Sequence, residues 1–203
     1  MNDILGFFIF STIEGIGIFI MMMAIFRLKP YKHLLGFIPV LLVMVFQSFI
    51  LREELSYPFL VPVVSILLFV LYQTVILRLP LVWSFIITLT GYTAFSVLQA
   101  GLLYIEFGGI ENFDSKSSEG YILQASTAAL QISLSLILLK YRIGFTADFD
   151  SLRLRAERII VIAVIALTIL GLALVALSIK AMFIVVVSFA FFLLYSIKKE
   201  RES

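Results

Sequence analysis

The sequence predicts an all-α fold, a bundle of seven transmembrane helices that forms a single integral membrane domain over residues 1–203. Composition is the first reason, because 62% of the residues are hydrophobic and only 14% are charged, whereas soluble domains are roughly a quarter charged. The second reason is that the apolar residues fall into runs of about 20, enough helix to cross roughly 30 Å of hydrocarbon. A soluble domain with so few polar groups would have a largely apolar surface, so we place the chain in a bilayer.

Five of the apolar runs are separated by clear polar breaks. The first is expected to be a retained span, since it lacks the basic start of a cleaved signal peptide and is too long for one. Only residues 178–180 interrupt the last two runs, and one helix across both would measure roughly 57 Å. We therefore predict a hairpin that turns at Lys180, with six spans as the alternative. The predicted spans are 4–26, 34–51, 59–77, 81–105, 121–139, 159–178 and 181–197.

The basic residues between the spans predict the orientation, because Lys and Arg prefer the cytoplasmic side. With seven spans, twelve of the 15 basic residues lie on one side, and only Arg52, Lys116 and Lys180 lie on the other. With six spans, nine basic residues lie on one side and five on the other, which is a weaker division. We therefore expect the N-terminus outside and the C-terminus inside.

Several function classes are excluded by the residues that the sequence lacks. The absence of cysteine excludes disulfides, thiolate metal sites and cysteine nucleophiles. The one histidine, His33, is too few for an intramembrane zinc protease, and Glu53-Glu54 lacks the arginine and histidines that accompany such a pair in diglutamate membrane proteases. A net charge of +2 without a basic stripe gives no support for nucleic-acid binding. We expect neither enzyme activity, metal nor cofactor.

Glu14 is the one charged residue inside a predicted span. A carboxylate in the middle of a membrane helix costs at least about 2.5–3.5 kcal/mol on insertion scales. We expect it to face the bundle interior and to be protonated at neutral pH, with Gln99, Gln124 or Gln131 as hydrogen-bond partners. Two kinds of role stay open. One is a functional role as a proton or cation site or as a contact to a ligand or another subunit, and the other is helix association alone.

Polar residues also form a stripe on the fifth predicted span. Gln124, Thr127, Gln131 and Ser135 share one helical face, which must look inward because lipid cannot satisfy an amide. The stripe is a candidate lining for a ligand cavity. Interhelical hydrogen bonds of about 0.6–2 kcal/mol each are the alternative.

A basic segment precedes the sixth predicted span. Its arginines, Arg153, Arg155 and Arg158, are candidates for pairing with anionic lipid headgroups at the cytoplasmic face. The alternative is a plain positive-inside anchor without a specific lipid site.

A pattern of features over about the first 105 residues resembles a known family. The features are Glu14-Gly15, Arg27-Leu28-Lys29-Pro30, a second helix that ends in Leu51-Arg52, and a polar residue late in the fourth helix. This arrangement resembles the membrane sensor half of Firmicutes histidine kinases of the peptide-pheromone receptor type. The resemblance implies a homodimeric module in a bacterial plasma membrane that senses an external or membrane-borne signal, often a peptide. The kinase domains of that family have no counterpart here, so we expect a stand-alone relative or a sensor domain separated from its kinase.

The predicted function is therefore a non-enzymatic membrane module that senses or relays a signal. Its expected partners are the lipid bilayer, a second copy or another membrane protein, and a peptide or small-molecule ligand. The alternatives are a small transporter, a substrate-binding subunit of one, or a structural subunit of a membrane complex. No inverted repeat and no matching pair of broken helices, the usual marks of a transporter, occur in the sequence.

Overall fold

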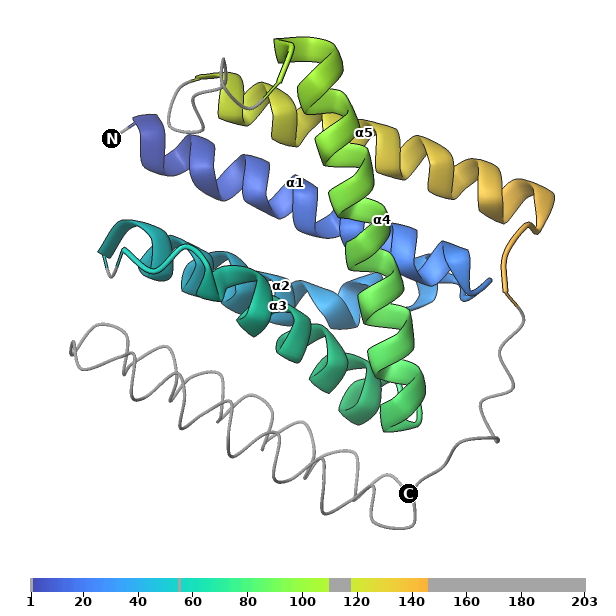
Figure 1. Ribbon diagram of the computed structural model, residues 1–203. Helices are drawn as coiled ribbons and strands as arrows, with labels where there is room; N and C mark the ends of the chain where they lie inside the picture. The colour runs from blue at the N-terminus through green and yellow to red at the C-terminus, as the bar shows by residue number, and fades with distance from the viewer. Residues whose placement is uncertain (1, 55, 110–117, 146–203) are drawn as a thin grey trace. The chain divides into compact units, whose positions relative to one another are not determined.

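The computed structural model describes residues 2–54, 56–109 and 118–145, and within these ranges all regular secondary structure is helical, without a strand. The all-α prediction is confirmed for this part of the chain. Four helices are long and apolar enough to cross a membrane (Figure 1). They are α1 (Asn2–Ile25), α2 (Leu34–Phe49) with the π-helical turn η2 (Ile50–Glu54), α4 (Leu81–Phe107) and α5 (Ser118–Tyr141).

The predicted spans 159–178 and 181–197 lie outside the described residues. So do the hairpin turn at Lys180 and the lipid-headgroup candidates Arg153, Arg155 and Arg158. The number of spans and the orientation therefore stay predictions.

The third predicted span forms a shorter helix than the other four. It consists of α3 (Leu60–Leu71) and the π-helical turn η3 (Tyr72–Ile76), and 17 residues extend only about 25 Å. Proline and a left-handed residue set its limits. Pro58 precedes the helix, and beyond its end Arg78 has a φ of 58° and is followed closely by Pro80.

The ends of α1 and α5 share one capping geometry, built on an arginine. Arg27 and Arg142 have φ values of 54° and 55°, in the left-handed region where glycine is the usual residue. The next backbone N–H bonds back across the last turn, from Leu28 to Met23 O at 2.9 Å and from Ile143 to Leu138 O at 3.0 Å. Each arginine thereby lies beside the negative end of its helix dipole.

The described contacts divide the chain into two compact units. Unit 1 contains residues 1–35 and 87–147, and unit 2 contains residues 36–86 and 148–203. The prediction of one membrane domain is not tested by this division, and each unit is described by itself.

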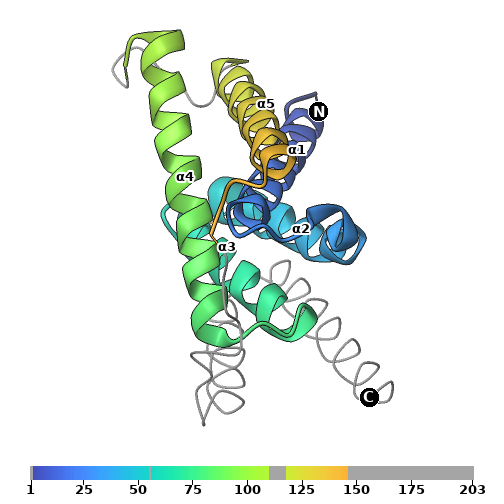
Figure 2. The same ribbon diagram turned by 90° about the vertical axis from the view of Figure 1, so that its right-hand side faces the viewer.

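In unit 1, α1 and α5 lie side by side and run in the same direction (Figures 1 and 2). The Phe10 and Tyr121 rings stack with centroids 5.1 Å apart. Further along both helices, a Cβ added at Gly17 would lie 3.3 Å from Ala128 Cα. Parallel packing is what two helices require if both cross a membrane in the same sense, as the topology predicts for these two.

The third helix of unit 1 is the part of α4 from residue 87 to 107, which crosses α1 with the opposite chain direction. The two backbones approach closely at Gly91, where an added Cβ would lie 2.5 Å from Met22 Cβ. After α5 the chain returns to the end of α1, since Phe145 N–H donates to Ile25 O at 2.8 Å. Gly144 permits this contact, because it has a φ of 150° and a Cβ there would collide with the same carbonyl oxygen.

Unit 2 contains an antiparallel hairpin of α2 and α3. Phe37 stacks on Phe69 at a centroid distance of 5.3 Å. At the other end of the hairpin, Gln47 Nε2 donates to Ser65 Oγ at 3.2 Å. Apolar ring packing and one polar contact therefore join the two helices.

Candidate functional site

The candidate site of unit 1 is centred on Glu14, which lies near the middle of α1 and is half-buried. Gln99 from α4 donates a hydrogen bond from Nε2 to Glu14 Oε1 at 3.1 Å, across 85 residues of sequence. Gln99 is one of the three amides that the sequence suggests as partners. This bond joins α1 to α4, because each helix supplies one of its two atoms.

Helix register brings Gln124 of α5 to the same level. Phe10 pairs with Tyr121, and Gly17 packs against Ala128. The two parallel helices therefore keep the same register between these pairs, and in this register Glu14 lies beside residue 125. Gln124 follows Tyr121 by three residues and precedes Ala128 by four, which puts it on the α5 face that contacts α1. Three helices therefore each contribute a polar side chain at one level of unit 1.

Gln131 lies two turns beyond Gln124 on the same face of α5 and is completely buried, at 0% exposure. Neither its Oε1 nor its Nε2 has a hydrogen-bond partner, and the buried Oε1 of Gln124 has none either. Gln131 reaches α1 at Gly17, where an added Cβ would lie 2.6 Å from its Oε1. A buried amide without partners costs roughly 1–3 kcal/mol, so these groups are unfavourable unless something else binds them. We call Glu14, Gln99, Gln124 and Gln131 the polar layer.

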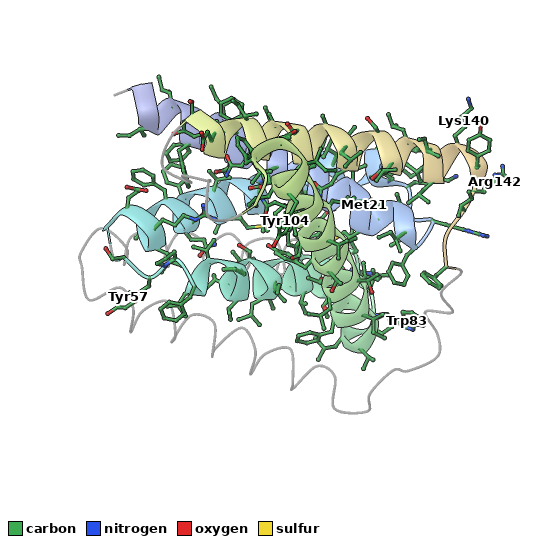
Figure 3. The ribbon with its side chains drawn as sticks, turned by 45° about the horizontal axis from the view of Figure 1, so that its top comes forward. Met21, Tyr57, Trp83, Tyr104, Lys140 and Arg142 are labelled. Carbon is green, nitrogen blue, oxygen red and sulfur yellow. The ribbon has the colours of Figure 1, made fainter. Side chains whose placement is uncertain are left out.

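The hydroxyl groups of the α5 stripe differ from its amides. Thr127 and Ser135 are also fully buried, which agrees with the inward-facing stripe that the sequence predicts. Thr127 donates to Leu123 O at 2.7 Å, and Ser135 donates to Gln131 O at 2.6 Å. Their own helix therefore accepts the proton of both hydroxyls, so neither is a buried donor without a partner. Ser135 also lies 3.3 Å from the sulfur of Met21 on α1, a residue labelled in Figure 3.

Charge is distributed unevenly along unit 1. Within residues 4–25, 87–105 and 121–139, Glu14 is the only charged side chain. Lys140 and Arg142 lie where α5 ends (Figure 3), at the same end as Arg27, whereas Glu106 and Glu119 lie at the opposite end. Among the described residues no three His, Asp or Glu side chains gather in a way that could hold a metal ion.

Two features of the site have only a weak signal in the sequence. Gly15 and Gly17 beside Glu14 permit a close helix approach but do not form the familiar G-x-x-x-G pattern, and Gly91 is visible only as a member of a loose stripe on the fourth span with Ser84, Thr88 and Gln99. Both become informative only when the partner helix is known, because each marks a position where a side chain has no room. The polar side chains themselves are visible in the sequence, since hydrocarbon makes every amide in a span conspicuous.

Comparisons of the chain with protein-family models, with curated proteins and with solved structures found no match. The function is therefore argued from the polar layer and from the helices that carry it.

Proposed function

We propose that the chain is a membrane module that senses or relays a signal and that does not act as an enzyme. The observation that carries the proposal is the hydrogen bond between Glu14 of α1 and Gln99 of α4. It is a polar link between two helices at the middle of a predicted span. Such a link can be opened by a ligand, as the energetics of polar contacts in membranes indicate.

Interhelical hydrogen bonds in membranes average about 0.6 kcal/mol and reach about 1.7 kcal/mol. A ligand that binds one arrangement of two helices tenfold more tightly than the other supplies about 1.4 kcal/mol. A modest difference in affinity is therefore enough to break or make the link. This balance suits a switch better than it suits a rigid structural subunit.

Unit 1 also provides a fixed point about which α4 can turn. Gly91 packs tightly against Met22, and Gln99 lies eight residues, about 12 Å, further along α4. The Gly91 contact acts as a pivot, and the Glu14–Gln99 bond acts as a latch. α5 remains with α1 through their parallel packing, so a signal at the latch moves α4 relative to the pair of α1 and α5.

The charges of unit 1 support the predicted orientation. Arg27 and Arg142 lie at one end and Glu106 and Glu119 at the other, and the basic end faces the cytoplasm under the positive-inside rule. The N-terminus is then outside, in a bacterial plasma membrane. The expected signal is a peptide or a membrane-borne molecule, and the expected assembly is a homodimer or a complex with another membrane protein.

The experiment measures whether α4 moves, using the absence of cysteine in the chain. Spin labels are attached at Ser96→Cys on α4 and Ser133→Cys on α5, two exposed positions of unit 1. Distances between them are measured in lipid vesicles for the parent chain, for Glu14→Leu, which removes the acceptor, and for the matched control Thr93→Leu at an exposed position of α4. We expect two distance populations whose ratio shifts in Glu14→Leu and not in the control.

Two results contradict the proposal. One is a single distance that Glu14→Leu leaves unchanged. The other is a solute or ion flux into the same vesicles that depends on Glu14, which identifies a transporter.

A further inference from the structure

We propose that one end of unit 1 binds the headgroups of anionic phospholipids through five basic side chains. They come from the chain that follows α1 and from the end of α5, and we call them the basic end: Arg27, Lys29, Lys32, Lys140 and Arg142. This site goes beyond the sensing function and does not depend on it, because it requires only that α1 and α5 cross a membrane.

The backbone brings the two basic segments together. Phe145 N–H donates to Ile25 O at 2.8 Å, and the rings of Phe145 and Phe26 lie with centroids 5.9 Å apart. Arg27 follows Ile25 by two residues, and Arg142 precedes Phe145 by three. Both arginines are therefore close to this contact, and segments that are far apart in the sequence form one surface.

The five basic side chains are exposed, and Figure 3 shows Lys140 and Arg142 at the end of α5. Residues 15–52 and 120–145 contain no Asp or Glu, so the segments that form this end supply no carboxylate to pair with the cations. The negative ends of the α1 and α5 dipoles, at about half a charge each, offset only about one of the five positive charges. The repulsion that remains is relieved when anions bind.

Apolar side chains beside the cations favour a phospholipid over a free anion. Four of them are each more than half exposed: Tyr31, Tyr141, Ile143 and Phe145. Lys140 Nζ lies 5.7 Å from the centroid of the Tyr141 ring, so a cation and an exposed ring are adjacent. Tyrosine rings are typical of the membrane–water interface. A phospholipid offers a phosphate to the basic residues and acyl chains to the apolar ones, whereas free phosphate offers only the first.

The test measures lipid preference locally, by fluorescence quenching in phosphatidylcholine vesicles. A fluorophore is attached at Leu136→Cys, an exposed position one turn before Lys140, since the chain has no cysteine of its own. The quenchers are spin-labelled phosphatidylglycerol and spin-labelled phosphatidylcholine with the nitroxide at the same acyl carbon. Ile122→Cys, an exposed position on the same face near the other end of α5, is the matched control.

We expect phosphatidylglycerol to associate at Leu136→Cys at least about fivefold more strongly than phosphatidylcholine, which is the effect of one basic residue near an anionic surface. No preference is expected at Ile122→Cys. Inorganic phosphate added at constant ionic strength should leave the preference unchanged. If the two lipids quench equally at Leu136→Cys, or if phosphate removes the preference, the lipid site is wrong.

Two variants with equal changes in charge separate the basic end from general attraction to positive charge. One combines Arg27→Asn, Lys140→Gln and Arg142→Asn, because asparagine tolerates the left-handed backbone of the two arginines. The other, with the basic end intact, combines Arg153→Gln, Arg155→Gln and Arg158→Gln. The first should abolish the preference and the second should retain it, while Lys140→Gln alone, at an exposed helical position, reduces it in part. A preference that survives the first variant, or that the second also removes, overturns the inference.

Discussion

Replacing Gly91 by alanine tests the packing of α4 on α1. The new Cβ would lie 2.5 Å from Met22 Cβ and 3.2 Å from Met22 Cα, whereas carbon atoms in contact are about 3.5–4.0 Å apart. Both Met22 atoms belong to or adjoin the backbone, so rotation of the side chain cannot relieve the clash. The helices must separate by about 1 Å or more.

Overpacking of this kind costs about 1–3 kcal/mol. The helix preference of alanine over glycine returns up to about 1 kcal/mol. We therefore expect Gly91→Ala to lower the free energy of unfolding by up to about 2 kcal/mol. Gly101→Ala on the same helix is the matched control, because no atom lies within 4 Å of its added Cβ, and it should be neutral or stabilising by up to about 1 kcal/mol.

The assay is equilibrium unfolding in mixed micelles with increasing SDS, followed by circular dichroism of the helices. Midpoints of the unmodified chain and of the two variants are compared under identical lipid and detergent ratios. If Gly91→Ala is as stable as Gly101→Ala, the close approach of α4 to α1 is wrong, and the pivot assigned to Gly91 is wrong with it.

Four further predictions concern Glu14, the topology, the end of α5 and activity. Glu14→Gln should keep the stability of the parent chain, while Glu14→Leu should lose about 1 kcal/mol because Gln99 Nε2 loses its acceptor; equal stability of the two variants would argue against the bond. A cysteine at Ser118 or Lys180 should react with an impermeant thiol reagent on intact cells, and one at Lys32 only after permeabilisation; the reverse pattern would invert the topology. Gly144→Ala should increase amide exchange of Phe145, whose N–H bonds to α1, and unchanged exchange would count against that contact. The purified chain should show no ATP turnover, and measurable turnover would contradict a non-enzymatic function.

Much of the fold of the described residues follows from the sequence, because hydrocarbon imposes one strong rule. Every backbone polar group must be bonded within the segment, so a long apolar run can only be a helix, and its ends fall at the nearest proline or charged residue. The structure places α1, α2, α4 and α5 within a few residues of the predicted ranges. The third span, observed at residues 60–76, also agrees to within a residue with the predicted 59–77; its π-helical turn and the left-handed Arg78 beyond its end have no hydropathy signal.

The sequence predicts which residues belong to the site, but it does not predict which of them contact one another. Glu14, Gln99, Gln124 and Gln131 are all conspicuous as polar groups in apolar runs. Which of them meet depends on how α1, α4 and α5 pack, and that packing is set by small residues such as Gly17 whose partners lie more than 100 positions away in the sequence. Hydropathy contains no information on such pairs.

The separation between Glu14 and its donor also has a consequence for the order in which the protein is made. The two residues lie 85 positions apart, and ribosomes add about 5–20 residues per second, so about 4–17 s pass between the synthesis of Glu14 and that of Gln99. During this interval α1 enters the bilayer before the helix that donates to its carboxyl exists. Contacts with α5 come later still, since Met21 and Ser135 lie 114 positions apart.

α1 is therefore synthesised before both of the helices, α4 and α5, that supply these contacts. A nascent chain that stops before α4 lacks Gln99, the donor of the hydrogen bond to Glu14 Oε1, and hydrocarbon raises the cost of a carboxyl that loses such a bond. The hydrogen bond of Glu14 thereby links the assembly of unit 1 to the completion of α4.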